Sequence, residues 1–336
     1  MNADATLRLV HTRTYSDPSA FSSLAAIWHR LLARDPTATV FHTPQYLATW
    51  WSEFGHGRAL RIVTVGEDDA PAGIAALVDL GDGTLDFVGD HDTTDYRGPV
   101  SAPEDRETVA EALLAAHDDW ARFHADGLAA DTGWPEAFTV AAKAAGHTVE
   151  EEPQDACPRL AIPASYGSYL AGLSGKLRHE IQRKTRRLER EGGPFTVRLS
   201  TEPTLDDDLE RFFAMHRSSD GPKGRFMHEG MATFFGSFAW MLFSQGWLRL
   251  SLLEVGGETW AGMYGYAYKN VWGVWNSAYM HGRRELSPGM VLVSECVRLA
   301  AEEGRDTFDF LRGTEPYKYR FGAVDTPLIG LAIIHS

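Results

Sequence analysis

A group of polar side chains follows a short strand expected at 307–310, near the end of the sequence. The run FDFLRGTEPYKYRFGA places Asp309 and Arg312 at the strand end and Tyr317 and Lys318 in the loop behind it. A carboxylate, a guanidinium, a phenol and an ammonium this close together could transfer protons or stabilise an oxyanion. The alternative is a salt-bridged loop that only covers the end of a sheet.

A second candidate site lies where the run LSPGMVLVSECV begins a helix, expected from Pro288 to Glu303. Ser287 suits the N-cap of this helix, and Pro288 suits its first helical position. The free backbone N–H groups and the dipole of a helix start attract phosphate, and Arg284 just upstream adds positive charge. The alternative is an ordinary capped core helix, because Ser-Pro-Gly is a common helix start.

A strongly basic helix is expected over 165–190. Between Lys176 and Arg190, seven Lys and Arg residues stand against two Glu, whereas the whole chain has a formal net charge of −14. Lys176 and Arg183 could therefore contact a phosphate-rich partner, such as coenzyme A, a nucleotide-linked sugar or a tRNA acceptor stem. A solvated helix face is the alternative.

Two histidine-containing segments complete the set of candidates. His216, near the end of a helix expected over 205–218, could act as a general base, although a lone His on an apolar helix is more often structural. The loop GDHDTTDY at 89–96 does not have the spacing of a calcium loop, so no metal is expected there. That loop is either a hydrogen-bonded sheet edge or a polar wall for an amine acceptor, formed by Asp95 and Tyr96.

These residues fall on a pattern of helices and strands that occurs twice. The first half is expected to hold a strand, two helices, a three-stranded meander and a helix, at 7–12, 19–34, 43–54, 61–65, 72–80, 84–88 and 104–123. The second half repeats this order, with its meander between 248 and 279 and a last strand at 328–335. An antiparallel meander followed by a late crossover helix predicts a mixed α/β (α+β) fold rather than strict βαβ alternation.

Length and composition fit a two-domain protein. The 336 residues are 44% hydrophobic, enough to bury two cores, and the acidic, proline-containing stretch at 150–163 predicts domains 1–155 and 156–336. No apolar run has the length of a membrane span, and the start MNADATLRLV lacks the apolar core of a signal peptide. A cytoplasmic location is therefore expected, and the net charge of −14 argues against DNA binding.

Three passages resemble the CelD-like acetyltransferases, a family of the GNAT superfamily. They are FHTPQYLATWWSEFG, LSGKLRHEIQRKTRRLEREGG and the run from LSPGMVLVSECV to YKYRFGA, and similar stretches extend from about residue 40 to 325. The family is related to the Fem-type aminoacyl-tRNA-dependent transferases, which also pair two GNAT-like domains. The resemblance implies tandem GNAT-like domains, each with a mixed sheet flanked by helices, and chemistry in the C-terminal one.

The resemblance also implies an activity. The chain would be an N-acyltransferase in a biosynthetic pathway, moving an acyl group from acyl-CoA, most often acetyl-CoA, to an amine of a small molecule or sugar, without a metal. Lys318 matches a lysine thought to stabilise charge on the reacting carbonyl in Fem-type enzymes. The donor pyrophosphate would bind Arg284, Ser287, Pro288, Gly289 and Met290. Other expected roles are catalytic for Tyr317, His216 and Asp309, and substrate-binding for Tyr264, Trp275, Asp95, Tyr96, Arg312, Lys176 and Arg183.

Two other functions stay open at this point. GNAT enzymes usually carry Gln/Arg-x-x-Gly-x-Gly/Ala where this chain has a single glycine and a proline, so fewer backbone N–H groups are free. A non-catalytic GNAT-like protein that binds a metabolite or scaffolds a complex is therefore one alternative. An aminoacyl-tRNA-dependent transferase is the other, and only this function would make tRNA a partner. Neither a membrane nor DNA is expected as a partner.

Overall fold

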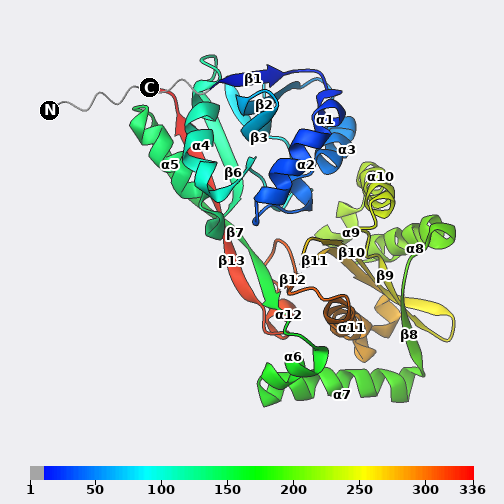
Figure 1. Ribbon diagram of the computed structural model, residues 1–336. Coiled ribbons are helices and arrows are strands. Elements are labelled where there is room, and N and C mark those ends of the chain that lie inside the picture. The colour runs from blue at the N-terminus through cyan, green and yellow to red at the C-terminus, as the bar shows by residue number, and fades with distance from the viewer. Residues whose placement is uncertain (1–10) are drawn as a thin grey trace. The chain divides into compact units, whose positions relative to one another are not determined.

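The chain divides into two compact units in the computed structural model, which describes residues 11–336 (Figure 1). Unit 1 runs to Asp155 and takes in Thr326–Ser336, and unit 2 comprises Ala156–Asp325. The last eleven residues thus fall in unit 1, whereas the boundary expected from the sequence assigned them to the C-terminal domain. The strand expected at Leu7–Thr12 lies almost wholly outside the described residues, and β1 begins at Thr12.

Unit 1 is built on a mixed sheet in which β4 and β6 run parallel, whereas β1/β2, β2/β3, β3/β4 and β6/β13 run antiparallel. Its strand order is β1-β2-β3-β4-β6-β13-β7, and the short β5 pairs with β3. The strands are β1 (Thr12–Tyr15), β2 (Ala59–Glu67), β3 (Ala70–Asp79), β4 (Thr84–Phe87), β5 (Val100–Ser101), β6 (Arg122–Ala129), β7 (Thr148–Ala161) and β13 (Val324–Ile334). The helices are α1 (Ala20–Ser23), α2 (Ala25–Arg34), α3 (Pro44–Phe54), α4 (Arg106–Ala115) and α5 (Trp134–Ala144).

One hydrophobic core cluster of unit 1 lies between its sheet and the pair α4 and α5. Leu113 of α4 and Phe138 of α5 pack with Leu77, Phe87 and Phe123 of the strands. The rings of Phe123 and Phe138 stack at 5.7 Å between centroids. The helix expected over 104–123 is wrong in its second half, because α4 ends at Ala115 and Phe123 already belongs to β6.

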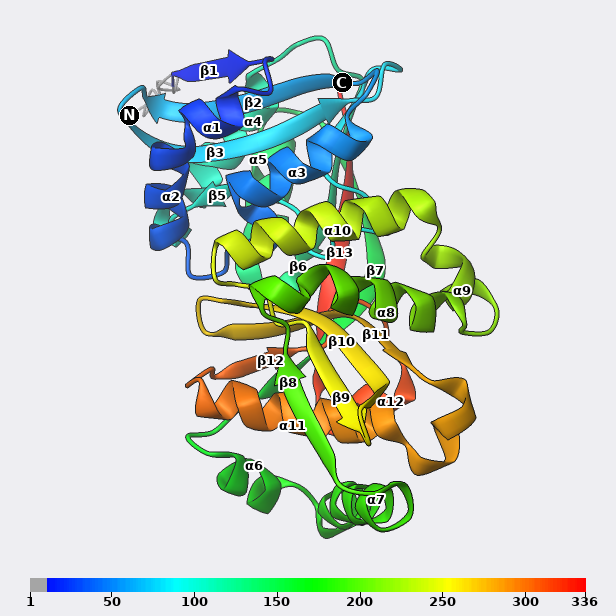
Figure 2. The same cartoon turned by 90° about the vertical axis from the view of Figure 1, so that its right-hand side faces the viewer.

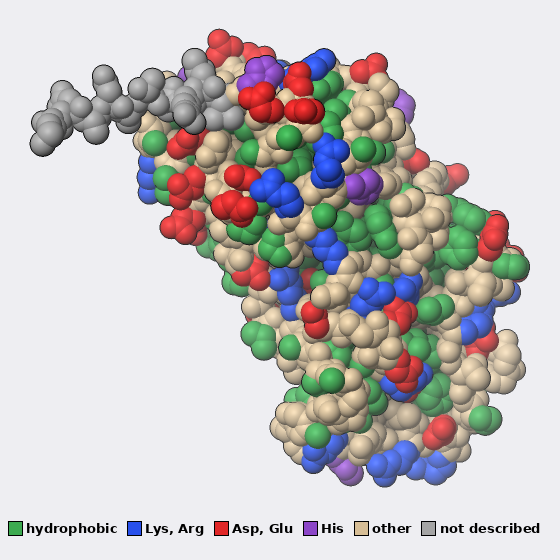
Figure 3. Space-filling view, in the orientation of Figure 1, with side chains coloured by type: hydrophobic (Ala, Val, Ile, Leu, Met, Phe, Trp, Pro, Cys, Tyr) green, Lys and Arg blue, Asp and Glu red, His purple; other side chains and the backbone are tan. Residues whose placement is uncertain are grey.

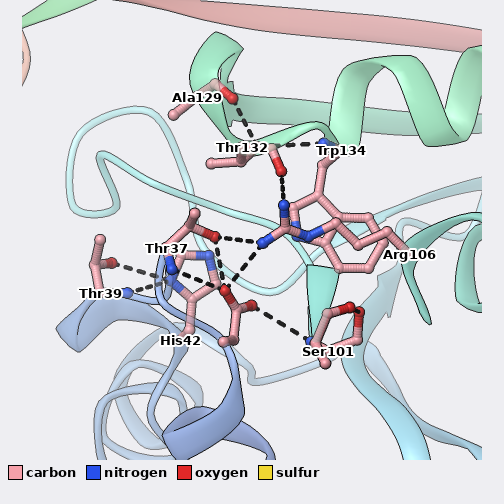
Figure 4. Close-up of polar contacts among 10 residues, drawn as sticks. Thr37, Thr39, His42, Ser101, Arg106, Ala129, Thr132 and Trp134 are labelled. Atoms are coloured by element: carbon pink, nitrogen blue, oxygen red, sulfur yellow. Dashed lines mark hydrogen bonds and ion pairs between the residues drawn. The ribbon is translucent and has the colours of Figure 1, made fainter. Parts of the chain in front are cut away.

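Arg106, the first residue of α4, forms a buried ion pair (Figure 4). One guanidinium nitrogen of Arg106 lies 3.1 Å from a carboxylate oxygen of Asp35 and 2.9 Å from the Thr37 hydroxyl. Arg106 also donates to the Thr132 carbonyl, and its guanidinium carbon lies 5.5 Å from the centre of the Trp134 ring. A buried side chain therefore fills the region where this crossover helix begins.

Removing this arginine is expected to destabilise the protein strongly. In Arg106→Met, the Asp35 carboxylate keeps its burial but loses its cation, which should lower the free energy of unfolding by about 3–5 kcal/mol. Arg34→Met is the matched control, since Arg34 pairs with Glu104 and Asp105 at the surface, and should cost less than about 1 kcal/mol. Denaturant titration of both variants checks this, and equal losses would contradict the role of the buried pair.

Unit 2 repeats the strand pattern of unit 1. Its strand order is β8-β9-β10-β11-β12, and β12 pairs with the last residues of β7, Arg159 to Ala161. The strands are β8 (Phe195–Leu199), β9 (Ser251–Val255), β10 (Glu258–Tyr268), β11 (Val271–Tyr279) and β12 (Thr307–Asp309). The helices are α6 (Tyr166–Gly172), α7 (Gly175–Gly192), α8 (Leu205–Arg217), α9 (Pro222–Phe226), α10 (Glu229–Ser244), α11 (Pro288–Glu302) and α12 (Pro316–Tyr319).

Helices cover both faces of the unit 2 sheet (Figure 2). The crossover helix α11 packs on β9, β10 and β11 and is itself covered by α7, whereas α8 packs on the other face of β10 and β11. The core on the α11 side includes Val293 and Val297 of the helix and Met263, Trp272 and Val274 of the strands. No helix within residues 11–336 is long and apolar enough to cross a membrane.

The parallel strands β11 and β12 diverge soon after they meet. They pair only from Val271 to Gly273 on β11 and from Thr307 to Asp309 on β12. β11 continues to Tyr279, while the chain after Asp309 turns away at Leu311, whose φ of 54° lies in the left-handed region. Among residues 11–336, the divergence leaves the second half of β11 without a strand neighbour on that side, next to the start of α11.

Candidate active site in unit 2

A cavity of about 510 Å³ lies at the end of β11 and the start of α11. Its walls combine apolar side chains, among them Met263, Leu292 and Val293, with hydroxyl groups of Ser277, Tyr279 and Tyr317. No acidic residue is among the described residues that line it. Four of the lining residues are basic and come from four separate segments of unit 2: Lys184, Lys223, Arg284 and Arg320.

The start of α11 supplies backbone donors to this cavity. Ser287 is the N-cap in a left-handed conformation, with a φ of 56°, and Pro288 in the first helical position carries no N–H. The next two residues, Gly289 and Met290, have N–H groups that precede the first i→i−4 hydrogen bond, which Val291 makes to the Ser287 carbonyl. Such a helix start favours an anion.

Basic side chains reinforce this helix start. The Lys184 ammonium of α7 donates to the Ser287 hydroxyl at 3.1 Å. Arg284 lines the same cavity, and within residues 11–336 its guanidinium has no ion pair or hydrogen bond. All five residues for which pyrophosphate binding was expected, Arg284 and Ser287–Met290, therefore line one cavity.

Tyr317 lies in the same cavity as the α11 start. It belongs to α12, and its phenol is hydrogen-bonded to Ser277 of β11. Burial, and next the nearby Glu315 carboxylate, raise the pKa of Tyr317. The phenol therefore keeps its proton at neutral pH and can act as a hydrogen-bond donor, but not as a base.

Lys318 holds a loop rather than facing the cavity. Its ammonium donates to the carbonyls of Leu311, Arg312 and Gly313 at 3.1, 2.9 and 2.8 Å and lies 2.9 Å from the Glu315 carboxylate. An ammonium has three N–H donors, so these partners leave none for a reacting carbonyl. This geometry does not fit the direct role at the reacting carbonyl that the sequence analysis expected for Lys318.

Asp309 and Arg312, like Lys318, make contacts within the loop that follows β12. The Asp309 carboxylate accepts from the Leu311 N–H at 2.8 Å and pairs with Arg159 at 3.1 Å. The backbone carbonyl of Arg312 is one of the three that Lys318 binds. Neither residue lines the cavity, so both are placed to fix the turn that follows β12.

His216 lies on the α8 side of β11 and does not line the cavity. Its Nε2 lies 3.2 Å from the amide oxygen of Asn276, an acceptor, so Nε2 carries the proton and Nδ1 is an acceptor. Burial, and next the charge of Lys223, lower the pKa of His216 to about 4. A group with so low a pKa is a weak base at neutral pH, which disfavours the expected general-base role.

The low pKa of His216 predicts a pH dependence of stability. Between about pH 4 and the ordinary value of 6.5, the unfolded chain binds a proton that the folded chain does not. The free energy of unfolding should therefore rise with pH across this window, by up to about 3 kcal/mol from this residue. Denaturant titrations at pH 4.5 and 7 should show a smaller rise in His216→Gln. The exposed His56, changed to Gln as a control, should leave the rise unaltered.

Of the two aromatic residues expected to bind substrate, Tyr264 lies in the core and Trp275 is half-buried against α10. Tyr264 is fully buried, and its hydroxyl donates to the Phe235 carbonyl at 2.8 Å. Trp275 contacts the rings of Phe235 and Phe238 of α10, with centroids 4.9 and 4.8 Å apart. Neither residue lines the cavity.

On the basic helix α7, Lys184 lines the cavity, whereas Lys176 and Arg183, which were expected to bind substrate, do not. Lys176 and Arg183 are exposed, and Figure 3 shows the basic surface over this helix. Lys184 shares the inner face with the buried Ile181 and Leu188. Its three- and four-residue spacing from these apolar residues was the signal in the sequence that could have identified it. Lys223, Ser277, Tyr279 and Arg320 had no comparable signal.

Asp95 and Tyr96 belong to unit 1, where both are buried. Their loop is internally hydrogen-bonded, since Asp90 accepts from the N–H groups of Asp92 and Thr93. Asp86, His124 and Asp126 in the same unit could together hold a metal ion by their spacing. However, Arg97 lies 2.8 Å from Asp86 and 3.4 Å from Asp126, so a guanidinium already balances both carboxylates.

Residues 175–319 match the family model described as an acetyltransferase (GNAT) domain. Unit 2 therefore carries a GNAT-type domain. No curated protein sequence matches the chain significantly. The matched segment contains the whole cavity lining, from Lys184 to Tyr317, apart from Arg320.

Solved structures share the fold of the whole chain. FemX is 13% identical, with a TM-score of 0.67 and 97% of each chain covered. The C-terminal domain of a putative lysylphosphatidylglycerol synthetase from Agrobacterium fabrum is 11% identical, with a TM-score of 0.59 over 93% of this chain and 92% of that one. A tandem GNAT protein from the clavulanic acid biosynthesis pathway is 12% identical, with a TM-score of 0.51 over 97% and 99%. The expected mixed fold with tandem GNAT-like architecture is confirmed.

Proposed function

We propose that this protein is a cytoplasmic N-acyltransferase that uses acyl-CoA, with acetyl-CoA as the first donor to test, and acylates an amine of a small molecule or sugar in a biosynthetic pathway. The observation that carries the proposal is the cavity at the α11 start, where backbone N–H groups lie near basic side chains and no described lining residue is a carboxylate. We further propose that the two units are its two GNAT-like domains and that only unit 2 binds the donor. In unit 1 the corresponding helix start, that of α4, holds the ion pair of Arg106 and Asp35, which supports donor binding by unit 2 alone.

The residues at the α11 start fit the phosphate groups of such a donor. The N–H groups of Gly289 and Met290 and the charges of Lys184 and Arg284 would hold them. A bound acyl-CoA would supply the thioester carbonyl that the amine attacks. Binding at a fixed site supplies the orientation on which a direct transfer depends.

Tyr317 is the cavity group best suited to the charge that develops in the reaction. Its phenol keeps its proton, and it is oriented by the hydrogen bond to Ser277. A protonated phenol in a partly apolar cavity can donate to a developing oxyanion or leaving thiolate. Lys318 and Asp309 would act indirectly, by fixing the loop and turn that lead into α12.

A thermal-shift titration with acetyl-CoA and free coenzyme A, followed by mass spectrometry of an amine panel incubated with acetyl-CoA, tests the proposal. We expect both ligands to raise the melting temperature and one amine class to gain an acetyl group. No shift with either ligand would argue for a non-catalytic GNAT-like metabolite-binding or scaffold protein.

The exposed basic face of α7 and the fold shared with FemX favour one alternative, an aminoacyl-tRNA-dependent transferase. Its donor would be a charged tRNA, which binds through phosphate contacts along such a face. Ribonuclease treatment separates the two functions. Acyl transfer by the purified protein that resists ribonuclease supports acyl-CoA as donor, and transfer abolished by ribonuclease supports tRNA.

A further inference from the structure

Lys223 is the basic residue of the cavity that the donor site does not explain. It comes from α9, whereas the helix start of α11 is served by Lys184 and Arg284. Arg320 is already paired with Glu180, at 3.4 Å. Lys223 therefore brings a separate positive charge into a cavity that is otherwise partly apolar.

No carboxylate in the described part of the chain neutralises Lys223 by contact. Its ammonium has no hydrogen bond or ion pair among residues 11–336, and the one acidic residue that influences it, Glu315, is bound to Lys318 at 2.9 Å. Desolvation lowers the pKa of Lys223. The residue as a whole is exposed, so a substrate can reach it. An accessible ammonium without a protein partner at a cavity wall is available to pair with a ligand carboxylate.

Lys223 lines the same cavity as Ser277 and Tyr317. Ser277 binds the phenol of Tyr317, the group that we propose faces the developing charge. We propose that Lys223 binds a carboxylate that one of the two substrates carries near its reacting group. One ammonium on a flexible side chain suits one carboxylate, whereas phosphate takes the several donors found at the α11 start.

This inference rests on the proposed acyltransferase function, and the carboxylate could come from either substrate. It could end the acyl group, as in a dicarboxylic thioester, or lie beside the acceptor amine, as in an amino acid. Calorimetric titration of the full chain distinguishes these sources. One arm compares succinyl-CoA with butyryl-CoA, and the other compares a panel of amino acids with the corresponding amides in the presence of coenzyme A.

We expect the acidic probe to bind better than its neutral partner in one of the two arms. Lys223→Met should reduce that preference about ten- to a hundredfold, and Lys223→Arg should retain most of it because the charge is kept. Lys143→Met, which removes an exposed lysine of unit 1, should leave the preference unchanged.

The possible failures are separable. If neither thioester nor coenzyme A binds the wild-type chain, the proposed function falls and this inference falls with it. If they bind, but no acidic probe is preferred or Lys223→Met keeps the preference, the proposed function stands and the carboxylate site is refuted. A third result would also overturn the inference. If both Lys223→Arg and Lys223→Met abolish turnover but neither changes the binding preference, this lysine has a proton-transfer role instead.

Discussion

Gly289→Asp is expected to weaken binding of acetyl-CoA by about ten- to a hundredfold while leaving the protein as stable as the parent. A Cβ atom at this position would lie 3.6 Å from the Tyr279 ring, an ordinary contact, so the backbone has room for a side chain. The new carboxylate would stand at the start of α11, where it repels the phosphates of the donor. The same carboxylate interacts favourably with the helix dipole, so the free energy of unfolding should not fall.

Gly289→Ala is the matched control for this change. It adds the same Cβ atom without the charge, and we expect donor affinity within about threefold of the parent, well below the effect of a misplaced charge. Isothermal titration with acetyl-CoA and denaturant titration on the same preparations measure both quantities. Equal affinities for the Asp and Ala variants would show that the phosphates do not bind at this helix start.

Lys318→Met is expected to reduce stability and turnover together. The substitution leaves the carbonyls of Leu311, Arg312 and Gly313 without their shared donor, and the ammonium it removes is buried. Leaving a buried carbonyl without its donor costs about 1–3 kcal/mol of the free energy of unfolding. Turnover should also fall, because the loop that leads to Tyr317 loses the group that fixes it.

The control for Lys318 is its acidic partner. Glu315 is largely exposed, so Glu315→Gln should cost less than about 1 kcal/mol and leave the three carbonyl contacts intact. Turnover and denaturant midpoint are measured on each variant. Turnover lost at unchanged stability in Lys318→Met would contradict the supporting role and restore a direct role at the reacting carbonyl.

The strongest sequence signals predicted the helix start correctly because they are local. Pro288 and the apolar periodicity of α11 required no knowledge of distant segments, and the resulting helix begins at Pro288 as expected. The expected helix over 165–190 is interrupted in the structure, because Ser174 caps a new helix by accepting from the Leu177 N–H.

The errors come from long-range pairing. Nothing near 116–123 in the sequence shows that Phe123 lies in a strand, because that strand is defined by its parallel pairing with β4 and its antiparallel pairing with the last strand of the chain. The role of Lys318 could not be read from its position after the strand either. Its carbonyl partners are set by the turn at Leu311, whose left-handed backbone no sequence pattern indicated.

Hydrogen exchange of the full chain with and without acetyl-CoA tests the central claim most directly. If the donor binds at the start of α11, amides of the peptide covering residues 287–293 should exchange more slowly when acetyl-CoA is present. The corresponding peptide at the start of α4, residues 103–109, should be unaffected, because Arg106 and Asp35 fill that region. Protection at 103–109 and none at 287–293 would contradict the assignment of the donor site to unit 2.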